Sequence, residues 1–235
     1  MMRSVLIIGS GPNAVEAETW SGFDHIIAIN NAWRIRSDWD SLIFPDDFDD
    51  SRQPPLVKPS QSLIRSADYV PIQNQFGGFV YAGGTMAFTA AYWALGALQP
   101  SVIAMIGCDM VYAPSGDTHF YGKGQADPLR DDISLRSLPA KASRLMALAA
   151  QRDCAMVNLS SDPSQLTFPR AQPLTAAANK PVQHDATTVA AALEKEAALN
   201  YYVPSGKYWK EESRFDAAQI DALYAMWSAL GPPAR

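Results

Sequence analysis

A histidine in a loop with glycines and tyrosines is the side chain of this sequence best suited to proton transfer. His119 is one of three histidines and stands in the stretch DTHFYGKG. Imidazole titrates close to neutrality, so His119 can act as a general base or acid. Tyr112, Tyr121 and Asp109 lie nearby in the sequence, and Lys123 can contact a phosphate. The alternative is that His119 only hydrogen-bonds its neighbours.

A glycine-rich turn near the N-terminus is the first candidate for binding a nucleotide. Gly9, Gly11 and Ala14 fit the G-x-G-x-x-G/A pattern directly after a short apolar run. Residues without side chains let peptide N–H groups approach an anion, and a following helix adds partial positive charge. The acidic residue expected about 20 positions later is replaced by Asn30 and Asn31. This disfavours a redox nicotinamide cofactor, and a tight turn with capping asparagines is the alternative.

A second glycine turn is a candidate for binding an anion. Gly84 and Thr85 follow another glycine and open a long apolar stretch. The first N–H groups of a helix are free, and a threonine there can cap the helix or donate its hydroxyl. The alternative is close packing of this helix against the sheet.

An acidic loop is the weak candidate for a metal site. Asp47 and Asp49 alternate after a predicted strand, and paired carboxylates of this kind can hold a divalent ion beneath a nucleotide diphosphate. Most acidic runs in loops are only solvated. The need for a divalent metal is therefore left open.

The elements that must position these residues alternate along the chain. Strand, helix and strand in repeated order predict an α/β fold with a Rossmann-like, doubly wound, mainly parallel sheet and helices on both faces. Ligands of such sheets bind outside the carboxyl ends of the strands. We expect strands at residues 5–8, 25–30, 40–44, 68–72, 101–106 and 155–159, and helices at 14–20, 86–98 and 138–152.

Proline spacing divides the chain into three parts. Residues 1–168 form the predicted nucleotide-binding domain, residues 169–183 a proline-rich connection, and residues 184–235 a small helical C-terminal appendage. The appendage is rich in aromatic residues, which is typical of interfaces. Contact with a partner or a second copy, as in a homo-oligomer, is therefore an alternative to packing on its own core.

Composition excludes several classes of function. The net charge is −5, and no Lys or Arg occurs between Arg65 and Lys123, so a nucleic-acid-binding face is not expected. Cys108 and Cys154 close apolar stretches and make no disulfide framework, which is typical of reduced thiols in a cytoplasmic protein. The stretch 69–108 lacks charges, but its glycines favour a buried helix and strand over a membrane span.

Several motifs, in this order, resemble the bacterial family 42 sialyltransferases. The same skeleton is similar to the archaeal 6-hydroxymethylpterin diphosphokinases. The resemblance covers about residues 4–168. The motifs are IIGSGPN at 7–13, INN at 29–31, GT at 84–85, IGCDMVY at 106–112 and NLSSDPSQL at 158–166.

The resemblance implies a Rossmann-like transferase that binds a nucleotide at the first glycine turn. Asn13 and Asn30 or Asn31 would contact the nucleotide, and the helix start at Gly84 and Thr85 would meet donor phosphate or a sugar carboxylate. Sialyltransferases activate the acceptor hydroxyl with a lid histidine and assist the leaving phosphate with tyrosines. The available counterparts by residue type are His119, Tyr112 and Tyr121.

Three functions follow from these observations. The first is a glycosyltransferase that takes a nucleotide-activated sugar as donor, transfers it to an acceptor that the sequence does not identify, and uses His119 as base. The second keeps the fold but transfers diphosphate from ATP, with Asp47 and Asp49 holding a divalent ion. The third is a non-catalytic nucleotide-binding or interaction module.

Overall fold

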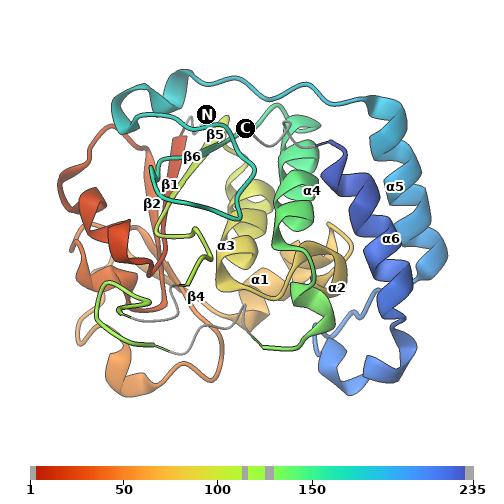
Figure 1. Cartoon of the computed structure of the whole chain (residues 1–235). Coiled ribbons are helices and arrows are strands. Elements are labelled where there is room, and N and C mark those ends of the chain that lie inside the picture. Colours follow the sequence, from red (N-terminus) through yellow and green to blue (C-terminus); the bar gives the residue numbers. More distant parts are fainter. Residues whose placement is uncertain (1–3, 113–115, 125–129, 231–235) are drawn as a thin grey trace.

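A six-stranded parallel sheet forms the centre of the computed structural model, which describes residues 4–112, 116–124 and 130–230 (Figure 1). The strand order β4-β3-β2-β1-β5-β6 reverses beside β1: the chain builds outward to β4 and then returns to β5. This confirms the predicted α/β, Rossmann-like architecture. The strands are β1 (Ser4–Ile8), β2 (His25–Ile29), β3 (Ser41–Ile43), β4 (Ser62–Ile64), β5 (Val102–Ile106) and β6 (Ala155–Asn158).

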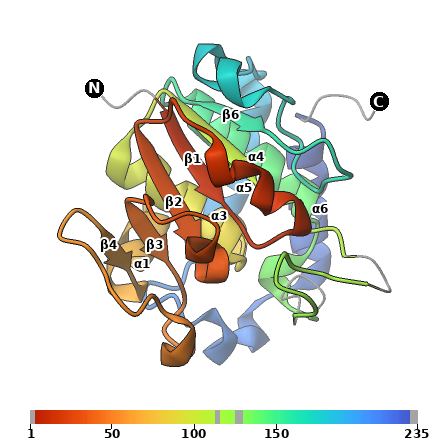
Figure 2. The same cartoon turned by 90° about the vertical axis from the view of Figure 1, so that its left-hand side faces the viewer.

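The two faces of the sheet are covered by different kinds of helix. Val5 and Ile7 of β1 pack under α1 (Ser66–Asn74), α3 (Met86–Trp93) and α4 (Leu138–Ala150). Leu6 and Ile8 point to the other face. Figure 2 shows that face, where the cover is short 3₁₀ helices, η1 (Pro12–Thr19) and η7 (Pro173–Ala178), which pack through small alanines.

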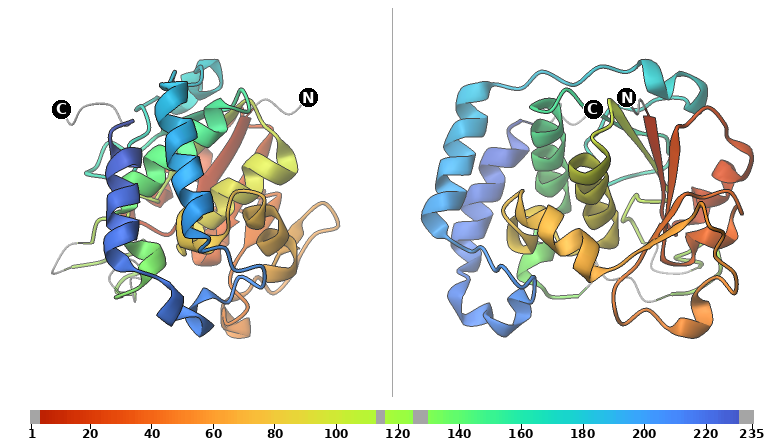
Figure 3. Two further views of the ribbon diagram at one scale, coloured as in Figure 1. Left: turned by 90° about the vertical axis from the view of Figure 1, so that its right-hand side faces the viewer. Right: turned by 180° about the vertical axis from the view of Figure 1, so that it is seen from behind.

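The C-terminal helices form an outer layer beyond α4. Figure 3 shows α5 (Ala186–Leu199) and α6 (Ala217–Ser228) side by side on the far side of α4 from the sheet. They share one buried cluster with α4 and α2 (Phe79–Ala82). The described part of the predicted appendage therefore packs on the rest of the chain, and residues 231–235 lie outside the described residues. No helix in the described ranges is long and apolar enough to cross a bilayer.

Two predicted elements differ from the structure. The strand expected at 68–72 is wrong, because these residues belong to α1, which accommodates Pro71. At its start, the N–H of Arg65 donates to the Asp68 carboxylate at 2.9 Å, and the Asp68 N–H donates to the Arg65 carbonyl at 2.8 Å. The edge strand β4 lies earlier in the chain. The helix expected over 86–98 ends at Trp93 and continues as a π-helical turn, Ala94–Leu98.

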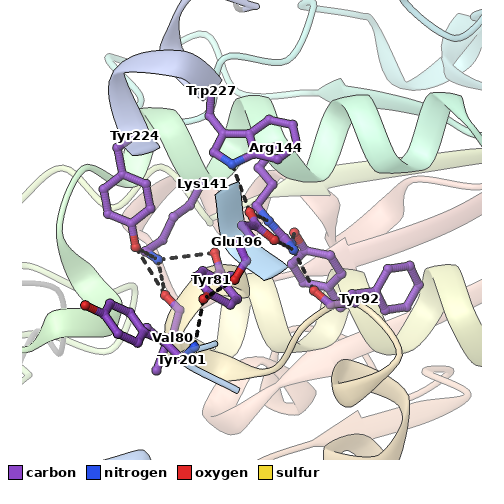
Figure 4. A network of polar contacts seen from close by, with 10 residues as sticks. Val80, Tyr81, Tyr92, Lys141, Arg144, Glu196, Tyr201, Tyr224 and Trp227 are labelled. Carbon is purple, nitrogen blue, oxygen red and sulfur yellow. Dashed lines mark hydrogen bonds and ion pairs between the residues drawn. The ribbon is translucent and has the colours of Figure 1, made fainter. Parts of the chain in front are cut away.

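A buried polar network ties the outer helices to the inner ones (Figure 4). Arg144 of α4 is 1% exposed and Glu196 of α5 is 5% exposed, and they pair through two hydrogen bonds of 2.7 Å. The Arg144 guanidinium also donates to the Tyr92 hydroxyl and the Phe76 carbonyl, and the Trp227 indole donates to Glu196. Buried charges of this kind are tolerated when they are paired and hydrogen-bonded.

Lys141 is a second buried cation in the same layer (Figure 4). Its ammonium group donates to the carbonyls of Val80 and Tyr81 in α2 and to the hydroxyl of Tyr224 in α6. Burial, together with the nearby charge of Arg144, lowers the pKa of Lys141 well below its ordinary value. These contacts fix the short helix α2, which leads directly into the glycine turn before α3.

Glu196→Gln should be strongly destabilising, because it leaves the Arg144 guanidinium buried without its counter-charge. Breaking one side of a buried ion pair costs about 3–5 kcal/mol. The matched control is Asp221→Asn, since Asp221 pairs with Arg136 on the surface, where side-chain exposures are 51% and 38% and such pairs contribute about 0.2–1 kcal/mol. Urea denaturation measures both, and equal small losses would contradict the assigned role of the network.

Candidate functional site

A cleft of about 1100 Å³ opens at the carboxyl ends of the central strands. Its lining comes from the turns after β1, β2, β3 and β5, the start of α3, and the segment 116–124, called here the His119 loop. This is the edge where the strand order reverses, as the fold class predicts for a ligand site. The predicted site residues that line it are Gly9, Gly11, Asn13, Asn30, Asn31, Asp47, Asp49, Thr85, Asp109, Tyr112, His119, Tyr121 and Lys123.

The first glycine turn interlocks with the turn after β5. The N–H of Gly9 donates to the Ile106 carbonyl and that of Gly11 to the Gly107 carbonyl, each at 2.8 Å. A Cβ on Gly107, whose φ is +67°, would lie 2.6 Å from the Cβ of Ala14. The backbone hydrogen bonds occupy the N–H groups of Gly9 and Gly11. Their N–H groups hold the neighbouring turn rather than facing an anion, and their lack of side chains permits the close approach.

Asn13, Asn30 and Asn31, called here the asparagine wall, line the cleft with hydrogen-bond acceptors that have no partner among the described residues. Within the described residues, no donor reaches the buried side-chain oxygens of Asn13, Asn30 and Asn31. Asn31 is 3% exposed, and Asn30 has a φ of +52°, a conformation that asparagine adopts more readily than most residues. The Asn13 amide nitrogen donates to Asp109 and Asp162 at 2.8 and 2.9 Å, which fixes the orientation of its oxygen. Buried polar atoms without partners are uncommon, and a water, an ion or a ligand group can satisfy them. Gln73, Asn74 and His184 carry further such atoms among the described residues and do not line the cleft.

Asp109, a predicted catalytic residue, belongs to a hydrogen-bonded cluster of side chains. Its carboxylate accepts from the amides of Asn13 and Asn158, at 2.8 and 3.3 Å. The Asn13 amide also lies 2.8 Å from the Ser160 hydroxyl. Asp162 completes this group and lines the cleft. Residue-type reasoning missed Asp162, although the NLSSDPSQL motif contains it.

The structure brings His119 and Tyr121 of the His119 loop together with Tyr112, which follows β5. The His119 ring stacks on Tyr121 at a centroid distance of 5.0 Å and lies 6.2 Å from the Tyr112 ring. The loop is tied to the first glycine turn, because the N–H of Phe120 donates to the Ser10 carbonyl at 3.0 Å. An imidazole and two phenol groups therefore share one side of the cleft.

The start of α3 brings Thr85, but not Gly84, to the lining of the cleft. Thr85 caps the helix by accepting from the N–H of Phe88 at 3.3 Å, and Thr85 lines the cleft. Gly84 does not line it. A Cβ on Gly84 would lie 2.8 Å from the Tyr208 hydroxyl and closer still to Ser134, so this glycine permits close packing, but against these two side chains rather than against the sheet.

The cleft has two more cations than the sequence suggested. Lys123 lines the cleft as expected, and Arg34 and Arg52 line it as well. Both arginines lie before the cation-free stretch, and Arg34 directly follows the asparagine pair in the 3₁₀ helix η2 (Asn30–Arg34). Because Arg34 lies on the turn after a predicted strand, its position in the sequence could have identified it as a cleft residue.

The acidic loop after β3 faces the same cleft. Asp49 caps the short 3₁₀ helix η3 (Asp50–Arg52), and hydrogen bonds from Ser51 lower the pKa of its carboxyl. The described His, Cys, Asp and Glu side chains form no group of three or more that is arranged to hold a metal ion. Asp47 and Asp49 therefore offer two carboxylates at the cleft without a further ligand of these types.

Comparison of the chain with protein-family models, with curated proteins and with solved structures found no match in any of the three. The fold and the cleft geometry therefore carry the functional argument. The resemblance to sialyltransferases remains a prediction from the motifs.

Gly9→Ala should disrupt the interlocked turns, because the new methyl group would lie 2.6 Å from the Cys108 sulfur and closer to the Gly107 carbonyl. We expect a loss of about 3 kcal/mol, at the upper end of ordinary overpacking. Gly22→Ala is the control, since nothing lies within 4 Å of its added Cβ and only its positive φ costs about 1 kcal/mol. Chemical denaturation compares them, and a Gly9→Ala loss no larger than that of Gly22→Ala would refute the interlock.

Proposed function

We propose that the protein is a nucleotide-dependent transferase that uses a nucleotide-activated sugar as donor. One observation carries this proposal. A single cleft at the reversal point of a Rossmann-like sheet combines unsatisfied acceptors with a histidine held between two tyrosines. The acceptors suit a nucleoside, and the ring cluster suits acid–base chemistry at a hydroxyl.

The asparagine wall selects for a ligand part that is rich in hydrogen-bond donors. The free oxygens of Asn13, Asn30 and Asn31 are acceptors, so they match ribose hydroxyls and the amino group of a base rather than phosphate. The N–H groups of Gly9 and Gly11 are used by the protein, so phosphate is assigned elsewhere in the cleft.

Phosphate is assigned to the start of α3 and to the cations of the cleft. Thr85 and the next two residues line the cleft at the positive end of a helix. Arg34, Arg52 and Lys123 add charge. The lining also holds five aspartates, at positions 47, 49, 109, 117 and 162, which disfavours a triphosphate without a divalent ion. This charge balance favours a sugar nucleotide over ATP.

The proposed reaction transfers the sugar to a hydroxyl. His119 removes the proton of the acceptor hydroxyl, whose oxygen attacks the anomeric carbon of the donor. The bond from that carbon to the phosphate oxygen breaks, and the leaving phosphate takes the electron pair. Tyr112, Tyr121 and Lys123 stabilise the charge on that phosphate, which is electrostatic help of the kind that contributes most to such steps.

Binding tests the nucleoside half of the proposal. We expect a CMP-, UDP- or GDP-sugar to raise the melting temperature, and Asn31→Ala to weaken that binding about 10-fold, since a lost hydrogen bond is worth about 1.4 kcal/mol. Asn179→Ala is the matched control, because Asn179 bonds its own turn at Thr175 and Ala176. Stabilisation by Mg-ATP alone would favour the diphosphokinase instead, and no stabilisation by any of these would count against both.

Turnover tests the catalytic half. His119→Gln should lower hydrolysis or transfer of the donor sugar by about 10²–10⁴-fold, the usual contribution of a general base, and leave donor affinity unchanged. His184→Gln, in the segment before α5, should leave both unchanged. Equal turnover in the wild type and in His119→Gln would favour the non-catalytic nucleotide-binding module.

A further inference from the structure

A threonine hydroxyl lies within hydrogen-bond distance of the His119 ring. The Thr118 hydroxyl lies 2.8 Å from the Nδ1 of His119, 3.2 Å from the carbonyl oxygen of Gly124 and 3.0 Å from the N–H of Gly124. We propose that Thr118 is a positioning residue that holds His119 in the Nδ1–H form. The role of this tautomer in catalysis rests on the proposed function. The assignment of the tautomer does not.

The Thr118 hydroxyl can donate only one hydrogen bond, and this limits the role of each of its three neighbours. A hydroxyl has one proton to donate and can accept two hydrogen bonds. The Gly124 N–H is a donor and the Gly124 carbonyl is an acceptor, so the hydroxyl accepts from the first and donates to the second. Its remaining position is an acceptor, and the Nδ1 of His119 must supply the proton. The opposite tautomer would leave the Gly124 carbonyl without the Thr118 proton.

The loop around the ring keeps these three groups together. His119 and Gly122 exchange two backbone hydrogen bonds of 3.0 Å, and Gly122 makes the turn with a φ of +111°. A Cβ on Gly124 would lie 2.5 Å from the Nδ1 of His119. The ring therefore packs directly against a glycine backbone, on the same side as Thr118.

The consequence for chemistry is a base at the other nitrogen. In the neutral ring with Nδ1–H, the lone pair is on Nε2. When Nε2 takes a proton, Nδ1 keeps its hydrogen bond to Thr118, so the ring needs no rearrangement between its two charge states. A positioned partner of this kind is how catalytic histidines are usually oriented.

Nuclear magnetic resonance tests the assignment without any substrate. In ¹⁵N-labelled protein, long-range proton–nitrogen correlations distinguish the two tautomers of each ring, and three His→Gln variants assign the signals of His25, His119 and His184. We expect the wild-type His119 ring to be Nδ1–H at a pH where it is neutral. Thr118→Ser should keep that form. Thr118→Val should lose it in favour of Nε2–H, the form that free imidazole side chains prefer in water.

The controls separate positioning from folding. Unchanged His25 and His184 signals show that each variant is folded, and Thr118→Ala is a second variant that removes the hydroxyl. A wild-type ring in the Nε2–H form, or an Nδ1–H ring that persists in Thr118→Val and Thr118→Ala, would overturn the proposal. With a donor sugar, Thr118→Val should lower kcat by about 10²-fold with little change in KM. If the NMR spectra show the predicted tautomers but no donor sugar is turned over, the proposed function is wrong and the role of Thr118 in positioning the ring is upheld.

Discussion

The close approach of two turns at the reversal of the strand order is the constraint on which the cleft depends. Parallel strands β1 and β5 lie side by side, and the chain leaves both at the same edge. Two glycine N–H groups bond the opposing turn at 2.8 Å, and a third glycine with a positive φ leaves no room for a side chain. Both turns line the cleft, so their close approach fixes one part of its wall. The asparagine wall, the start of α3 and the His119 loop are all placed relative to that edge.

The molecule treats polar groups in two opposite ways. On the helical side, Arg144 and Glu196 are buried but paired, and with Tyr92 and Trp227 they link α3, α4, α5 and α6, which rigidifies this layer. In the cleft, three amide oxygens are buried without partners among the described residues. An unmet acceptor is costly to stability, and proteins tolerate such costs chiefly at functional sites. The paired charges stabilise the outer helices, and the unpaired acceptors of the cleft support the proposed nucleotide site.

Local sequence chemistry predicted much of this arrangement. Apolar runs ending in glycine predicted β1 and β5, and their common carboxyl edge brought His119, Asn13 and Asp109 into one cleft as expected. The cap at Arg65 and Asp68 is a local contact, but the apolar run after it concealed the helix start. The packing of Gly84 was not predictable, because it depends on Ser134 and Tyr208, which lie in distant segments. The same holds for Asp162, which meets Asn13 across 149 positions of sequence. Spacing identifies the residue types, but the fold decides which atoms remain free.

The side-chain amides of the asparagines give the most direct test of the cleft as a nucleotide site. Titration of ¹⁵N-asparagine-labelled protein with CMP, UMP, GMP and AMP, followed by resonance of the amide groups, reports each asparagine separately. We predict that at least one nucleotide shifts the signals of Asn13, Asn30 and Asn31 in a saturable way and leaves Asn74, Asn179 and Asn200 unchanged. If no nucleotide moves the three cleft signals, or if only the distant asparagines respond, the cleft is not the nucleotide site.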